Sequence, residues 1–132
     1  MTEALTAASR RRVAFVVDDE HVIATLTAII LNKAGFEAHA MFSGEEAVAS
    51  LATLQPDLLI TDVMMGRMNG IEVATIFRNK LPDCKILLFS GQAATNDLLE
   101  KAHAQGHDFE ILAKPVHPTD LIAKLRSLNW AR

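Results

Sequence analysis

The sequence contains a single cysteine, Cys84, and its first twelve residues lack the apolar stretch of a signal peptide. One cysteine cannot form an internal disulfide, so a disulfide-stapled fold is excluded and a reducing compartment fits. No apolar run is long enough to cross a bilayer. We therefore expect a cytoplasmic protein with no membrane contact.

The chain also lacks a strongly basic surface. Its formal net charge is −3, and its only dense basic cluster is Arg10–Arg12, which we interpret as the solvated flank of a first strand. This charge does not favour direct binding to nucleic acid. Because the 132 residues contain no repeat, low-complexity segment or linker, we expect one domain over residues 12–130, preceded by a flexible tail over residues 1–11.

Short apolar runs alternate with helical patterns along the chain. This alternation predicts an α/β fold in which a parallel sheet is covered on both faces. Strands are expected near residues 13–17, 36–42, 58–61, 85–89 and 109–113, and helices near residues 20–34, from 43 onward, and near 71–80, 95–105 and 118–128. Right-handed crossovers then favour a flavodoxin-like (βα)5 doubly wound sheet with strand order 2-1-3-4-5.

The helix expected over residues 20–34 carries large apolar side chains at helical spacing. The stripe consists of Val22, Ile23, Leu26, Ile29, Ile30 and Ala34. Such a stripe is typical of a face buried against a sheet. We therefore expect the exposed positions of this helix to be polar or small, and its end to lie at Gly35.

Several strands end on residues that can handle phosphate or metal. Asp18 and Asp19 follow the first strand, Asp62 the third, Ser90 the fourth and Lys114 the fifth. Ligands of open α/β sheets bind outside the carboxyl ends of the strands. Since strands 1 and 3 are expected to be neighbours, three carboxylates should converge at this edge, together with a hydroxyl and an amine.

Three close carboxylates repel one another, and a hard divalent cation with oxygen ligands relieves that repulsion. Mg²⁺ is the cofactor that we expect, bound at Asp18, Asp19 and Asp62. A carboxylate can accept a phosphoryl group as an acyl phosphate, and Asp62 is the best nucleophile of the three. Phosphoryl transfer requires positioning and charge stabilisation, which Ser90 and Lys114 can supply.

Four motifs carry a resemblance to a known family. The segments VVDDE, PDLLITDVMMGRMNGIE, ILLFSG and AKPV stand in the order and spacing of the receiver domain of two-component response regulators. The resemblance covers about residues 12–128. It implies a stand-alone receiver whose Asp62 takes phosphate from the phosphohistidine of a sensor histidine kinase or a histidine phosphotransfer protein.

The resemblance also implies roles for individual residues. Asp19 and Asp62 would bind Mg²⁺ directly, with the backbone carbonyl of Met64 as a third ligand, whereas Asp18 would act through metal-bound water. Ser90 stands at the Ser/Thr position of the family. Lys114 stands at its lysine, where the bond to Pro115 is expected to be cis.

Two positions depart from the family's pattern. Ile111 stands where many relatives carry an aromatic residue that swings inward when the Ser/Thr closes on the phosphate, so Ser90 and Ile111 together pose the question of how this switch works. Phe109, on the same strand face, is a weak candidate to replace the missing ring. Gly66 stands where many relatives carry proline, which should loosen the loop after Asp62.

The functional prediction is a phosphorylation-driven switch that controls binding of an unidentified downstream protein. We do not expect an enzyme beyond its own phosphorylation and dephosphorylation, and we expect a monomer or a phosphorylation-dependent dimer. The donor should dock near the first helix. One alternative is a degenerate receiver that binds partners without phosphorylation. A less favoured alternative is an aspartyl-phosphate phosphatase, because Met64 stands where such enzymes usually carry an acid.

Overall fold

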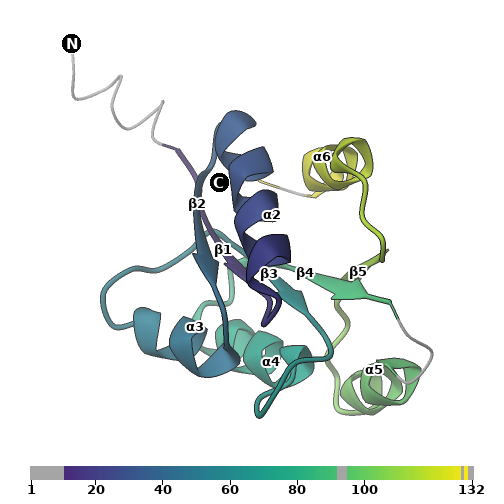
Figure 1. Ribbon diagram of the computed structural model, residues 1–132. Coiled ribbons are helices and arrows are strands. Elements are labelled where there is room, and N and C mark those ends of the chain that lie inside the picture. The colour runs from purple at the N-terminus through teal and green to yellow at the C-terminus, as the bar shows by residue number, and fades with distance from the viewer. Residues whose placement is uncertain (1–10, 92–94, 129, 131–132) are drawn as a thin grey trace.

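The computed structural model describes residues 11–91, 95–128 and 130, and the described residues form a three-layer α/β fold (Figure 1). Five parallel strands lie in the order β2-β1-β3-β4-β5. The strands are β1 (Val13–Val17), β2 (Glu37–Met41), β3 (Leu58–Asp62), β4 (Lys85–Ser90) and β5 (Glu110–Ala113). The helices are α2 (His21–Lys33), α3 (Gly44–Ser50), α4 (Gly70–Lys80), α5 (Thr95–Ala104) and α6 (Pro118–Ser127). The predicted flavodoxin-like fold and its strand order are confirmed.

The sheet separates two hydrophobic cores. Helices α2 and α6 cover one face, and α3, α4 and α5 cover the other (Figure 1). Because side chains of a strand alternate between faces, neighbours in β1 enter different cores: Phe15 packs with Phe77 of α4, whereas Val16 packs with Leu31 of α2 and Leu121 of α6. The central strands are therefore buried on both sides, as their continuous apolar sequences predicted.

Helix α4 begins earlier than its sequence pattern indicated, because Asn69 is a cap rather than part of the loop. The Asn69 side chain accepts a hydrogen bond from the Glu72 backbone N–H, and the Glu72 carboxylate accepts one from the Asn69 N–H, each at 2.9 Å. This reciprocal capping box satisfies backbone donors that the first turn leaves unpaired. It fixes the start of α4 directly behind the loop that follows Asp62.

The prediction that the large apolar stripe of α2 is buried was wrong. Small side chains face the sheet instead, and the buried residues of α2 are Ala24, Thr27, Ala28 and Leu31. Val22 is 68% exposed and Leu26 is 53% exposed, and Ile23 and Ile29 are also exposed. Both sets recur at helical spacing, so periodicity alone could not choose between them.

The physical reason lies in the strands beneath α2. The sheet presents Val16, Leu58 and Ile60 to this helix, and all three belong to the same core as Ala24 and Ala28. Branched side chains on the sheet fill the space between the layers, so small residues on the helix complete a close-packed interface. Of the predicted stripe, Ile30 alone joins this core as a partly buried neighbour, and Ala34 caps the helix.

Residues 1–10 of the tail expected over residues 1–11 lie outside the described residues. Arg11 donates hydrogen bonds to the backbone carbonyls of Gly35, Asn32 and Phe36. These bonds tie the start of the described chain to the C-terminal end of α2. No helix among the described residues is long and apolar enough to span a membrane.

Candidate functional site

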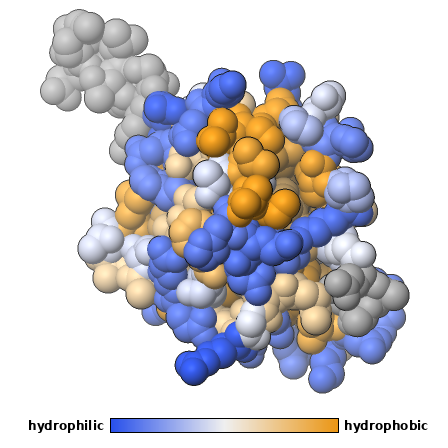
Figure 2. Space-filling model, viewed as in Figure 1, coloured by the Kyte–Doolittle hydropathy of each residue, from blue (hydrophilic) through white to orange (hydrophobic). Residues whose placement is uncertain are grey.

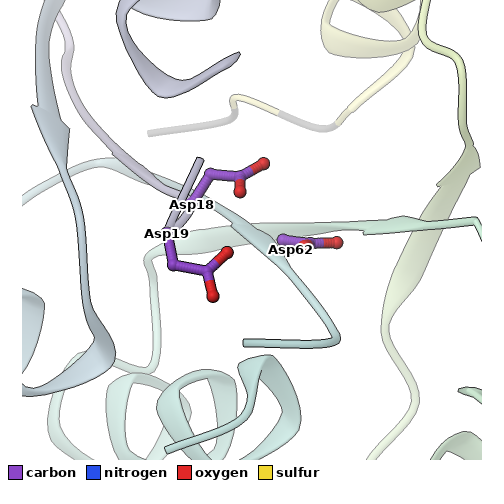
Figure 3. Close-up of side chains that lie close together, drawn as sticks. All are labelled: Asp18, Asp19 and Asp62. Carbon is purple, nitrogen blue, oxygen red and sulfur yellow. The ribbon is translucent and has the colours of Figure 1, made fainter. Parts of the chain in front are cut away.

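The carboxyl ends of β1 and β3 bring three aspartates together. Asp18 and Asp19 follow β1, and Asp62 ends β3, which pairs with β1 through Val17 and Thr61. Oxygen atoms from the three carboxylates lie within 4.8 Å of one another. Figure 3 shows the three side chains gathered at the adjacent ends of β1 and β3. The sequence-based expectation that these carboxylates converge is met by this geometry.

Lys114 reaches the same cluster from the end of β5. Its Nζ atom lies 3.1 Å from Oδ1 of Asp62 and 3.6 Å from Oδ2 of Asp18. The Lys114 backbone N–H donates to the carbonyl of Ser90 at 3.0 Å, and the Lys114–Pro115 bond is cis, as expected. The lysine thus lies between two buried carboxylates.

Ser90 ends β4 one residue beyond the partner of Asp62. In the β3–β4 register Asp62 faces Phe89, and in the β4–β5 register Ser90 faces Ala113, next to Lys114. Ser90 therefore lies at the same edge of the sheet as Asp62 and Lys114, as the sequence indicated. Its side chain is half-buried.

Ile111 faces Leu88 in the register of β4 and β5 and is exposed at 39% of its surface. Phe109 precedes β5, packs against the core that contains Phe77, and lies under the guanidinium of Arg78, 5.0 Å from its ring centre. Its ring is engaged toward the amino end of β5, away from Ser90. This placement does not favour Phe109 as a replacement for the missing aromatic residue.

Burial dominates the electrostatics of the cluster. Removal from water raises the pKa of both Asp18 and Asp62, because it disfavours their charged forms. Nearby Lys114 opposes this rise without cancelling it. For Lys114 itself burial lowers the pKa, but the hydrogen bond to Asp62 and the two carboxylate charges outweigh burial, so its pKa is raised. One lysine therefore leaves the three carboxylates short of positive charge.

The donor set fits a hard divalent cation. Asp18 Oδ1 accepts a hydrogen bond from the Glu20 backbone N–H at 3.0 Å, whereas buried Oδ2 has no hydrogen-bond partner among the described residues and only Lys114 Nζ, 3.6 Å away, as an ion-pair partner. A buried carboxylate oxygen without a hydrogen-bond donor is costly, and a second cation bound to it would offset that cost. Oxygen atoms from three carboxylates within 4.8 Å are the ligands that Mg²⁺ takes in proteins.

Gly70 lets α4 start directly against the backbone of Asp62. A Cβ atom at position 70 would lie 2.0 Å from the Asp62 carbonyl oxygen, and the Gly70 N–H donates to the Val63 carbonyl at 2.8 Å. Only a residue without a side chain allows this approach. The sequence pattern placed the start of this helix near residue 71, so the positioning role of Gly70 was missed.

A groove of about 890 Å³ leads from the aspartates along α2. Polar residues of the acidic cluster line one end, and aliphatic residues of α2 and of the segment between β5 and α6 line the rest. The lining includes Asp19, Asp62, Met64, Lys114, Ile23, Leu26, Ile30 and Val116. The phosphoacceptor candidate is therefore reached through an opening with one largely apolar wall.

Comparison with known proteins places this chain in a family. The chain matches the response regulator receiver domain over residues 14–126. It is 30% identical over 118 residues to the DNA-binding response regulator MtrA of Mycobacterium tuberculosis H37Rv, covering 89% of this chain and 50% of MtrA. It is also 30% identical over 113 residues to the alkaline phosphatase synthesis transcriptional regulatory protein PhoP of Bacillus subtilis, covering 86% of this chain and 46% of PhoP.

Solved structures agree with this match. The chemotaxis protein CheY4 of Vibrio cholerae superposes with a TM-score of 0.79 at 26% identity, covering 90% of this chain and 99% of CheY4. A signal receiver domain of an HD domain-containing protein from Pseudomonas fluorescens gives 0.80 at 25% identity, covering 89% of this chain and 93% of that domain. The chain spans about half the length of the curated relatives it matches. It belongs to the receiver domain family of two-component response regulators.

Proposed function

We propose that Asp62 is the phosphoacceptor of this receiver domain and that residues 12–130 form the domain, after a tail over residues 1–11. The observation that carries the proposal is the placement of the buried Asp62 carboxylate beside Asp18 and Asp19, with Lys114 Nζ at 3.1 Å. Receiver domains are signalling modules. The reaction proposed here is therefore a single transfer that changes the domain itself.

In that transfer an oxygen of Asp62 forms a bond to phosphorus. If the donor is a phosphohistidine, the bond between nitrogen and phosphorus breaks, and the imidazole keeps the electron pair. The product is an acyl phosphate on Asp62. Because only ionised Asp62 is a nucleophile, its environment has to offset the burial that raises its pKa.

Asp19 and Asp62 would hold Mg²⁺ together with the Met64 backbone carbonyl, and Asp18 would contribute through bound water. When bound, the ion supplies positive charge to the carboxylates and to the oxygens of the incoming phosphoryl group. Lys114, which already contacts Asp62, would pair with a phosphoryl oxygen. Ser90 would donate a hydrogen bond from its hydroxyl group to another phosphoryl oxygen. The movement of Ser90 would begin the conformational switch, with Ile111 at the position where many relatives carry an aromatic residue.

The donor would be a sensor histidine kinase or a histidine phosphotransfer protein. It would reach Asp62 through the groove that runs between α2 and the segment after β5. We therefore still propose that the donor docks near α2, the first helix. The output would be a change of surface that a downstream protein reads. Met64, exposed beside Asp62, offers no acid for the turnover that an aspartyl-phosphate phosphatase requires.

The test is intact mass after incubation with acetyl phosphate, with and without Mg²⁺. We expect a gain of one phosphoryl group that requires Mg²⁺ and is absent in Asp62→Asn. The matched control is Asp83→Asn, an exposed aspartate away from the cluster, which should be phosphorylated like the wild type. Lys114→Ala should still accept phosphate but should lose the response to it, measured as the difference in proteolysis between the phosphorylated and free forms.

Unchanged phosphorylation of Asp62→Asn would refute the assignment. If the wild type neither gained phosphate nor bound beryllofluoride with Mg²⁺, the degenerate-receiver interpretation would replace it. Phosphorylation of the wild type therefore distinguishes a phosphoacceptor receiver from a degenerate receiver directly.

A further inference from the structure

The exposed face of α2 carries more large apolar surface than the fold uses. Of the six large hydrophobic side chains that are exposed among the described residues, four lie on this helix: Val22, Ile23, Leu26 and Ile29. Figure 2 shows the corresponding orange surface gathered over α2. Contiguous apolar patches of this kind on a folded domain mark interaction surfaces. We call these four residues the apolar strip.

Charges of opposite sign lie at the two ends of the apolar strip. At the N-terminal end, Glu20 is the N-cap of α2 and is exposed, next to exposed Asp19. At the C-terminal end, exposed Lys33 lies in the last turn. Arg11 is bound to backbone carbonyls at that same end, so its charge adds to that of Lys33. The surface is thus acidic at the N-terminal end of α2, apolar in the middle and basic at the C-terminal end.

Two copies of this surface are complementary in charge when their α2 helices run antiparallel. Glu20 lies six residues before Leu26, near the centre of the apolar strip, and Lys33 lies seven residues after it. If a second α2 packs antiparallel across a two-fold axis at Leu26, Ile23 meets Ile29 and each Glu20 lies next to the Lys33 end of the other copy. A parallel arrangement would place like charges together, which opposes association. Closed two-fold symmetry is also the commonest arrangement of identical chains.

We propose that the apolar strip is a self-association surface on which a second copy of this chain packs with its α2 antiparallel. One helix face and its charged ends would bury roughly 1,200 Å² in total, which is at the low end for specific interfaces. The dimer should therefore be weak and reversible, with a dissociation constant in the micromolar range.

Self-association would also regulate access to Asp62. Ile23 and Leu26 belong both to the apolar strip and to the wall of the groove that ends at Asp62 and Lys114. A second copy on the strip would cover that wall, so a phosphodonor would have to compete with it. This consequence rests on the proposed phosphoacceptor role of Asp62, whereas the dimer itself does not.

Sedimentation equilibrium tests the dimer over about 1 to 300 μM protein, a range that brackets a micromolar constant. Leu26→Gln should raise the dissociation constant at least about tenfold, because it places a polar group at the centre of the interface. Ile111→Gln is the matched control, since Ile111 is an exposed aliphatic residue on β5. It should leave the constant within about twofold.

Charge reversal tests the antiparallel arrangement. Lys33→Glu and Glu20→Lys should each weaken the dimer several-fold at low salt, and the double variant should restore it, since both contacts are then re-formed with exchanged signs. An equal mixture of the two single variants should associate more strongly than either variant alone. A merely hydrophobic stickiness would not show this rescue.

Three results would overturn the proposal: a monomer throughout the concentration range, a dimer disrupted by Ile111→Gln and not by Leu26→Gln, or no rescue by charge reversal. The regulatory part has its own readout. The rate of phosphorylation per molecule by acetyl phosphate should fall as wild-type concentration rises, and at low salt the fall should shift to several-fold higher concentration for Lys33→Glu. If neither protein is phosphorylated, the proposed function fails while sedimentation still decides the dimer.

Discussion

Helices α2 and α4 both start next to the acidic cluster, yet they use their apolar residues in opposite ways. In α4 the large side chains Val73 and Phe77 are fully buried. In α2 the sheet is contacted by Ala24 and Ala28, while Val22 and Leu26 face outward. Apolar surface that the core does not need is available for binding. The contrast shows that α4 contributes more large side chains to the core, and it underlies our proposal that α2 contacts other molecules.

The largest test of this contrast compares one apolar truncation in each helix. Phe77→Ala should cost about 3–5 kcal/mol of unfolding free energy, because it opens a cavity between α4 and Phe15 of β1. Leu26→Ala should change the unfolding free energy by less than about 0.5 kcal/mol, because the side chain is largely solvated. Urea unfolding at low protein concentration measures both. Equal costs would show that the exposed face of α2 is structural after all.

Two glycines, Gly66 before α4 and Gly70 at its first position, sharpen the comparison further. Gly70→Ala should cost about 2–3 kcal/mol, since its Cβ would meet the backbone of Asp62 and the helix start would have to shift. Gly66 has nothing within 4 Å of a Cβ and no positive φ. Gly66→Ala should therefore be neutral or stabilise by up to about 0.5 kcal/mol, through the lower entropy of the unfolded chain. The same urea titration checks the pair.

Asp18, Asp19 and Asp62 should bind a divalent cation together and thereby stabilise the folded domain. Mg²⁺ at ten times its dissociation constant should stabilise the wild type by about 1.4 kcal/mol, because only the folded chain assembles the cluster. The gain should be present at pH 7 and should shrink as pH falls through the raised pKa values of Asp18 and Asp62, where protons compete with the ion. Melting temperature with and without Mg²⁺ measures it, and Asp19→Asn should lose most of it. A full gain in Asp19→Asn would contradict the assigned ligand set.

The smallest effect concerns Asp62 without a divalent cation. Its pKa is raised in the folded chain, so its ionised form opposes folding above that pKa, and the penalty disappears as pH falls below the value of an unfolded aspartate. Asp62→Asn should therefore stabilise the metal-free domain by roughly 1 kcal/mol at pH 7, and by progressively less as pH falls toward 4. Thermal melts in EDTA across this range check the trend. Stabilisation that does not vary with pH would mean that packing, rather than charge, is its cause.

The sequence was sufficient for the fold and for the convergence of Asp18, Asp19, Asp62 and Lys114, because both follow from the pattern of strands and strand ends. Continuous apolar runs ending in Asp18, Asp62, Ser90 and Lys114 predicted buried parallel strands whose ends meet. The prediction of burial was wrong for β5, which lies at the edge of the sheet and is largely exposed. Once the strand order follows from handedness rules, the convergence of these residues follows as well.

What the sequence could not supply depends on contacts between elements. The orientation of α2 was predicted wrongly because two stripes on that helix share the same period, and the branched residues of the sheet decide between them. The role of Gly70 was missed because it depends on a contact with another element. A Cβ atom at this position would lie 2.0 Å from the Asp62 carbonyl oxygen. The sequence likewise could not show how far Lys114 offsets the negative charge of the aspartates, because this depends on the distance from its Nζ atom to Asp18 and Asp62.

The central claim is that Asp62 carries the phosphoryl group as an acyl phosphate. It is tested most directly by reducing the phosphorylated protein with borohydride, which converts an aspartyl phosphate to homoserine, and then mapping peptides by mass. If Asp62 is the phosphoacceptor, we expect homoserine at position 62 and unchanged aspartates at positions 18 and 19. Homoserine at either of those two positions, or a phosphorylated protein that yields none, would contradict it.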